Sequence, residues 1–128
     1  MAVNILIVDD SKVVRTVIEK TLKLAEVPVG QVHHAANGRE ALNILADQWV
    51  DLIFADINMP VMNGVEMIEK LAADGVLQSI PVVVISTEGS TTRVEQLKQK
   101  GVTAYLRKPF RAEQLRDIVN DVLGLSHA

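Results

Sequence analysis

The sequence predicts an α/β fold, a parallel sheet with helices on both faces, and three observations support this prediction. Short apolar runs alternate with longer segments in which apolar residues recur every three or four positions, five of each. The links between them are short, and the chain contains no internal repeat or low-complexity segment. Strands and helices that alternate in this way form a parallel sheet covered on both faces. The 128 residues suffice for one such domain, residues 1–128, with a core over about residues 3–124.

The first half of the chain contains the first two strand–helix pairs. A nearly continuous apolar run at residues 4–8 predicts a buried strand, which ends in Asp9-Asp10-Ser11. The residues expected on the inner face of the next helix have three- and four-residue spacing: Val14, Val17, Ile18, Thr21, Leu22 and Ala25. Residues 31–36 predict a second strand, polar enough for a sheet edge, and Asn37-Gly38 predicts a turn. The expected apolar face of the second helix contains Ala41, Leu42, Leu45 and Trp49.

The second half continues the alternation. Residues 52–55 predict a strand that ends in a single acid, Asp56, and Met59-Pro60 stops regular structure after it. A helix begins at about Gly64, with these residues expected inward: Val65, Ile68, Leu71 and Ala72. A strand at residues 82–85, a loop at 86–89 and a polar helix at about 91–100 follow, and Gly101 stands where a C-cap glycine belongs. A strand at residues 104–106, a Lys108-Pro109 loop and a helix at 112–123 complete the pattern.

Polar side chains follow four of the expected strands. They are Asp9-Asp10, Asp56, Ser86-Thr87 and Lys108, after the first, third, fourth and fifth strands. Ligands of open parallel sheets bind beyond the carboxyl ends of the strands. The sequence therefore predicts a functional site where three carboxylates, a hydroxyl group and an ammonium group meet.

The chemistry of this set indicates a metal ion and a phosphoryl group. Three carboxylates brought together repel one another, and a hard divalent cation relieves the repulsion. Oxygen ligands without His or Cys favour magnesium. A cation, a lysine and a hydroxyl donor around one carboxylate suit a tetrahedral dianion, and phosphoryl transfer needs little more than such positioning and charge neutralisation. Asp56 is then a nucleophile that forms an acyl phosphate.

Four sequence motifs carry a resemblance to a known family. NILIVDD, DINMPVMNG, VVVIST and YLRKPF each occur at an expected strand end. Together they resemble the receiver domain of two-component response regulators, over about residues 3–123. The resemblance implies a flavodoxin-like, doubly wound sheet with strand order 2-1-3-4-5, the order known for CheY, a member of this family.

The resemblance also implies a role for each motif residue. Asp56 corresponds to the phosphoacceptor, and Asp10, Asp56 and the main-chain oxygen of Asn58 to Mg²⁺ ligands, with Asp9 acting largely through water. Ser86 and Tyr105 occupy the switch positions, Lys108 pairs with the phosphoryl group, and the Lys108-Pro109 bond is expected to be cis. Asn58 and Glu88 flank the phosphoryl group, where we expect them to influence its lifetime.

By the same resemblance, the chain is a phosphorylation-activated switch rather than an enzyme acting on another substrate. It would accept a phosphoryl group from a histidine kinase or phosphotransfer protein, bind a downstream protein, and dephosphorylate itself. At most four residues follow the expected domain, so we expect no output domain. The expected partner face is formed by the fourth helix, fifth strand and fifth helix. This part of the chain is basic. From residue 90 onward it has 7 basic and 4 acidic side chains, whereas residues 1–89 have 6 basic and 12 acidic ones. The basic residues expected on the partner face include Arg93, Lys98, Lys100, Arg107 and Arg111.

Composition argues against several other classes. There are no cysteines, no apolar run long enough to span a membrane and no N-terminal signal pattern, so we expect a cytoplasmic protein without membrane insertion. Aromatic residues make up only 3% of the chain, which leaves a nucleic-acid surface unsupported. No G-x-G-x-x-G motif supports dinucleotide binding. His33 and His34 are adjacent strand residues pointing to opposite faces, so they are not expected to share a metal ion.

Two alternative functions use similar residues or a similar fold. A small aspartate-nucleophile, Mg²⁺-dependent phosphohydrolase also combines Asp, Ser or Thr, and Lys. In the sequence pattern typical of such enzymes, the nucleophile ends the first strand and a second Asp lies two residues later. Here the first-strand acids are adjacent, and the single acid ends the third strand. A flavin-binding module would need aromatic loops, whereas the single Trp is expected on a helix.

Overall fold

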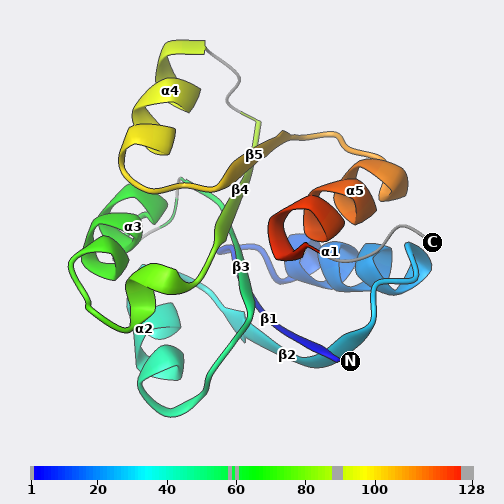
Figure 1. Cartoon of the computed structure of the whole chain (residues 1–128), viewed down its shortest axis with the longest axis horizontal. Helices are drawn as coiled ribbons and strands as arrows, with labels where there is room; N and C mark the ends of the chain where they lie inside the picture. The colour runs from blue at the N-terminus through cyan, green and yellow to red at the C-terminus, as the bar shows by residue number, and fades with distance from the viewer. Residues whose placement is uncertain (1, 58, 60, 88–90, 125–128) are drawn as a thin grey trace.

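The structure is a computed structural model that describes residues 2–57, 59, 61–87 and 91–124. Its elements follow one another as β1 (Val3–Val8), α1 (Lys12–Leu24), β2 (Val29–Ala35), α2 (Gly38–Asp47), β3 (Leu52–Ala55), α3 (Gly64–Ala72), the 3-10 turn η1 (Leu77–Ser79), β4 (Val82–Ser86), α4 (Thr91–Gln99), β5 (Ala104–Arg107) and α5 (Ala112–Leu123). The strands form one five-stranded sheet in the order β2-β1-β3-β4-β5 (Figure 1), and every pairing is parallel. The predicted fold class and strand order are confirmed.

The strand register aligns the carboxyl ends of the central strands. Val8 lies opposite Ala35 on one side and Ala55 on the other. Ser86, the last residue of β4, lies opposite Arg107 at the end of β5. The residues that follow these strands therefore emerge at one edge of the sheet, as a parallel arrangement requires.

Two apolar cores cover the two faces of the sheet. The helices α1 and α5 pack on one face and α2, α3 and α4 on the other (Figure 1). Alternate residues of a strand point to opposite faces, so Ile7 enters the core with α1 and α5, while Leu6 and Val8 enter the other. β1, β3 and β4 are buried on both faces, which explains their nearly continuous apolar sequence.

Three residues predicted to be buried on helices are exposed, and one strand begins earlier than predicted. α2 ends at Asp47, so Trp49 lies beyond the helix and is 52% exposed rather than buried on its apolar face. Val17 and Ala72 are exposed as well, because each lies at the edge of the stripe that its helix buries. The edge strand β2 begins at Val29, two residues earlier than expected.

Two predictions about the backbone are confirmed. Gly101 follows α4 with φ at +111°, where a glycine avoids the steric conflict that a side chain would meet. Its N–H donates to the Lys98 carbonyl, and the Val102 N–H donates to that of Leu97. The Lys108-Pro109 peptide bond is cis. Among the described residues, no helix combines the length and apolarity needed to cross a membrane.

Candidate functional site

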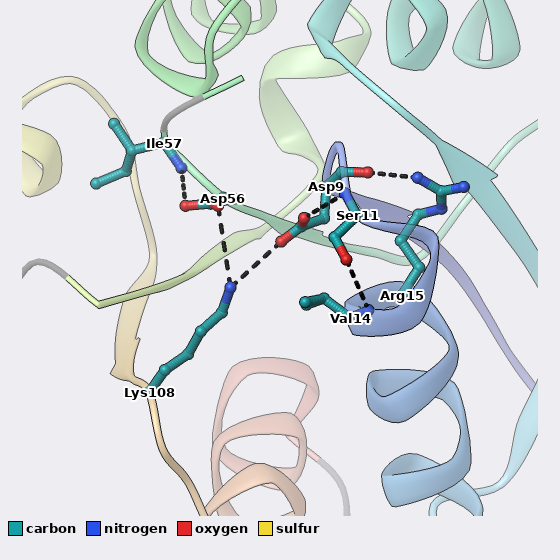
Figure 2. Close-up of polar contacts among 7 residues, drawn as sticks. All are labelled: Asp9, Ser11, Val14, Arg15, Asp56, Ile57 and Lys108. Atoms are coloured by element: carbon teal, nitrogen blue, oxygen red, sulfur yellow. Dashed lines mark hydrogen bonds and ion pairs between the residues drawn. The ribbon is translucent and has the colours of Figure 1, made fainter. Parts of the chain in front are cut away.

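Asp9 lies at the centre of the site and is nearly inaccessible to solvent, 2% exposed. It follows β1, and its main-chain N–H donates to the Ala35 carbonyl of the edge strand. Its Oδ1 accepts a hydrogen bond from the Ser11 N–H at 2.8 Å, and its Oδ2 accepts one from Lys108 Nζ at 3.3 Å (Figure 2). The Ser11 hydroxyl in turn caps α1 by accepting from the Val14 N–H. The start of α1 is thus tied to the carboxylate.

Asp56 follows β3, the neighbouring strand, and its carboxylate faces the same space. Its N–H donates to the Val8 carbonyl, so its backbone continues the β1–β3 ladder by one residue. Oδ1 accepts from the Ile57 N–H at 2.7 Å, and Oδ2 lies 3.9 Å from Lys108 Nζ. Figure 2 shows the Lys108 ammonium group reaching from the end of β5 between Asp56 and Asp9.

Three carboxylates gather here, and they fit a divalent metal ion. One oxygen from each of Asp9, Asp10 and Asp56 lies within 4.8 Å of the other two. Opposite oxygens around a bound Mg²⁺ are about 4 Å apart, so these carboxylates would need to move little to share one ion. The set contains only oxygen donors, the chemistry that Mg²⁺ prefers. Asp10 is exposed, which leaves a way in from solvent.

The remaining expected site residues are placed in part. Ser86 is buried at the end of β4, and its carbonyl accepts from the Lys108 N–H, which joins the β4 and β5 ends. Tyr105 lies on β5 opposite Val84, packed against the core beneath α3 and α4. Its hydroxyl is buried with no hydrogen-bond partner among the described residues. Asn58 and Glu88 lie outside the described residues.

Of the basic residues expected to meet a partner, four have described side chains, and all are exposed or partly exposed. Lys98 lies in the last turn of α4 and Lys100 directly after that helix, Arg107 ends β5, and Arg111 precedes α5. Lys100 lies 3.8 Å from a Glu69 carboxylate oxygen, and Arg111 lies 3.8 Å from one of Glu113. These four residues thus lie in, or directly next to, the three elements predicted to form the partner face.

Sequence reasoning did not identify Arg15 as part of this region. Its Nη1 donates to the main-chain carbonyl of Asp9 (Figure 2), and its Nε donates to His34 Nδ1 on β2 at 3.3 Å. His34 Nε2 is 2.6 Å from a Glu19 carboxylate oxygen, and Lys23 Nζ is 3.1 Å from the other. The hydrogen bond from His34, and then that from Lys23, holds the pKa of the Glu19 carboxyl below its ordinary value. The four-residue spacing of Arg15, Glu19 and Lys23 was the one available signal.

The sequence model of the response regulator receiver domain matches residues 5–120. The chain is 36% identical over 122 residues to the chemotaxis protein CheY1 of Helicobacter pylori strain J99, covering 94% of this chain and 97% of that protein. It superposes on the chemotaxis response regulator CheY4 of Vibrio cholerae with a TM-score of 0.85 and 34% identity, covering 96% and 100% of the two chains. A second similar structure, the receiver domain of sensor histidine kinase PA1611 from Pseudomonas aeruginosa PAO1, has a magnesium ion coordinated in its active-site cleft; the TM-score is 0.84 at 27% identity, covering 97% and 99% of the two chains.

The chain therefore belongs to the response regulator receiver family. Within that family it is CheY-like, a two-component signalling protein rather than an enzyme in its own right. Membership implies a kinase partner, and the acidic cluster of Asp9, Asp10 and Asp56 fits a phosphorylation site.

Proposed function

We propose that the chain, taken as a single receiver domain over residues 1–128, accepts a phosphoryl group on Asp56 from a cytoplasmic histidine kinase or phosphotransfer protein. The observation that carries this proposal is the position of Lys108. Its ammonium group lies 3.3 Å from Asp9 Oδ2 and 3.9 Å from Asp56 Oδ2, beside three carboxylates that can share a metal ion. A dianionic phosphoryl group on Asp56 would thus lie near the ammonium group of Lys108 and near a cluster that can bind a cation, and both would neutralise its charge.

In the transfer step, an oxygen of the Asp56 carboxylate attacks phosphorus. A P–O bond forms, the bond from phosphorus to the donor histidine nitrogen breaks, and the electron pair of that bond stays on the imidazole. Lys108 can then pair with a phosphoryl oxygen, which needs only a small movement of its flexible side chain. When bound by Asp9, Asp10, Asp56 and the main-chain oxygen of Asn58, Mg²⁺ would neutralise charge on the phosphoryl oxygens.

Signalling ends when water attacks phosphorus and the P–O bond to Asp56 breaks. The products are inorganic phosphate and the original carboxylate, with one proton released to solvent. We assign control of this step to Asn58 and Glu88, which flank the site in sequence. While the phosphoryl group is present, Ser86 and Tyr105 would transmit its effect to the face formed by α4, β5 and α5, where the downstream protein binds.

The position of the nucleophile argues against the phosphohydrolase alternative. The single acid follows β3, and the acids after β1 are adjacent rather than two residues apart. The family match likewise favours a receiver.

The test is to incubate the protein with acetyl phosphate and Mg²⁺ and to map the modified residue by mass spectrometry. We expect one phosphoryl group on Asp56 and none in Asp56→Asn. Lys108→Arg keeps the charge but not the point-like ammonium group, so it should be labelled more slowly. A phosphoryl group on Ser86 or Thr87, or steady turnover of added phosphate esters, would contradict the proposal.

A further inference from the structure

A chain of polar contacts connects the edge strand β2 to the loop after β1 through the side of α1. His34, on β2, hydrogen-bonds to two residues one turn apart on α1, Arg15 through Nδ1 at 3.3 Å and Glu19 through Nε2 at 2.6 Å. Arg15 also donates to the carbonyl of Asp9. Arg15 thus links His34 to the main chain at Asp9. His34 has no role in the proposed phosphoryl transfer.

The partners of His34 determine where its proton lies. A guanidinium group is charged at any accessible pH and can only donate hydrogen bonds. Nδ1 of His34 must therefore accept from Arg15 Nε–H, so it carries no proton. Nε2 then carries the single proton and donates to Glu19. These two contacts are the ones that the Nε2–H tautomer of His34 makes.

Adding a second proton would break one of these contacts. Among the described residues, the charged groups that reach His34 come from α1 and are Arg15, Glu19 and, through Glu19, Lys23. On β1, the strand paired with β2, its neighbour is the apolar Ile7. A proton on Nδ1 would set an imidazolium N–H against the Arg15 N–H, two donors and two positive charges, while the pair with Glu19 would persist.

We propose that neutral His34 is a positioning residue for the divalent cation site: it holds Arg15 on the Asp9 carbonyl and so holds the Asp9-Asp10 turn in place for the ion. The second contact at this turn, from the Asp9 N–H to the Ala35 carbonyl, also comes from β2, beside His34. The inference rests on the proposed function only in taking Asp9, Asp10 and Asp56 as the metal site.

The experiment is a titration with Mg²⁺, followed by calorimetry at about pH 8, above the range in which histidines ordinarily change charge. His34→Lys imitates the protonated ring, because it can pair with Glu19 but offers Arg15 no acceptor. His34→Gln offers Arg15 an acceptor and Glu19 a donor without titrating. His33→Gln is the matched control, since His33 is adjacent and faces the other side of the strand.

At about pH 8 we expect His34→Lys to bind Mg²⁺ about tenfold more weakly than wild type, the lower end of the effect of losing an outer-shell partner. His34→Gln, which keeps both contacts, and His33→Gln should each bind Mg²⁺ about as tightly as wild type. Full affinity in His34→Lys, or a loss of affinity in His33→Gln as large as that in His34→Lys, would overturn the inference.

A second measurement needs no metal. The ring ¹⁵N chemical shifts of His34 at high pH should identify a protonated Nε2 and a bare Nδ1, and the opposite tautomer would contradict the proposal. Labelling of Asp56 by acetyl phosphate separates the two ideas. If wild type is not labelled, the proposed function is wrong, whereas the Mg²⁺ affinities of the variants still decide the role of His34.

Discussion

At the scale of single residues, Lys108 offsets only part of the charge that the three aspartates bring together. Its ammonium group serves both Asp9 and Asp56, while Asp9, Asp10 and Asp56 lie within 4.8 Å of one another. Without a metal ion, each carboxylate therefore lies near two like charges, and Lys108 is within 4 Å of Asp9 and Asp56. The cluster is arranged for a ligand at some cost to the stability of the metal-free protein.

Asp56→Asn should consequently stabilise the metal-free domain. The substitution removes two repulsions and one attraction, a net gain of about 1 kcal/mol, or about 4 °C in Tm for a domain of this size. Thermal unfolding in EDTA measures it. With saturating Mg²⁺ the order should reverse, because wild type gains about 1.4 kcal/mol at ten times its Kd and the mutant has lost a ligand. A lower Tm for Asp56→Asn in EDTA would mean that the carboxylates do not destabilise one another.

Residues at strand ends were predictable, whereas Arg15 and His34 were not. Asp9, Asp10, Asp56, Ser86 and Lys108 follow from the sequence, because parallel strands deliver their carboxyl ends to one edge whatever the details of packing. The contact between Arg15 and His34 depends on how α1 is rotated against an edge strand. Periodicity identifies the buried stripe of a helix but not which flanking residue meets which strand.

At the scale of elements, α3 is held close against the end of β3. The Gly64 N–H donates to the Ile57 carbonyl at 2.8 Å. A Cβ on Gly64 would lie 2.3 Å from the main-chain oxygen of Asp56 and 2.9 Å from the Cα of Ile57. Both obstacles are backbone atoms, so no side-chain rotation can relieve the conflict, and the segment carrying Asp56, the proposed phosphoacceptor, would have to move.

Gly64→Ala should therefore lower the free energy of unfolding by about 2 kcal/mol, a typical cost of overpacking, and should also weaken Mg²⁺ binding. Gly75→Ala is the matched control, since a Cβ there meets nothing within 4 Å; it should be neutral or slightly stabilising. Urea unfolding measures the first effect and a Mg²⁺ titration the second. An alanine at position 64 that leaves both unchanged would show that the loop after β3 yields freely.

Element types were easier to predict than element ends. The central strands are recognisable because both of their faces are buried, which keeps them apolar throughout. β2 has exposed residues, so its start at Val29 left no clear signal. Trp49 fits the apolar spacing of α2, yet the helix ends two residues before it. A local pattern does not reveal that the chain must leave the helix there to enter β3.

At the scale of the whole molecule, the site and the proposed partner face are connected by β4 and β5. Ser86 ends β4 beside the site, and the Lys108 N–H bonds to its carbonyl. Tyr105 lies on β5 opposite Val84, near α4. Its buried hydroxyl has no partner among the described residues, and a buried unpaired hydroxyl costs about 1–3 kcal/mol. The inward position of Tyr105 is thus only modestly favoured, which suits a residue that changes position.

Ser86→Ala should separate phosphorylation from signalling. A phosphoryl group on Asp56 brings new acceptor oxygens towards Ser86, and a hydrogen bond to a charged group contributes about 1.5–3 kcal/mol. A bond of that size shifts a two-state equilibrium by roughly tenfold or more, but only if it differs between the states. Alanine cannot make this bond, whereas threonine can. We therefore expect Ser86→Ala to be labelled on Asp56 yet to show less than half of the wild-type amide shifts at Lys98, Lys100 and Arg107 when beryllofluoride and Mg²⁺ are added. Ser86→Thr should restore them, and full wild-type shifts in Ser86→Ala would exclude Ser86 as the coupling residue.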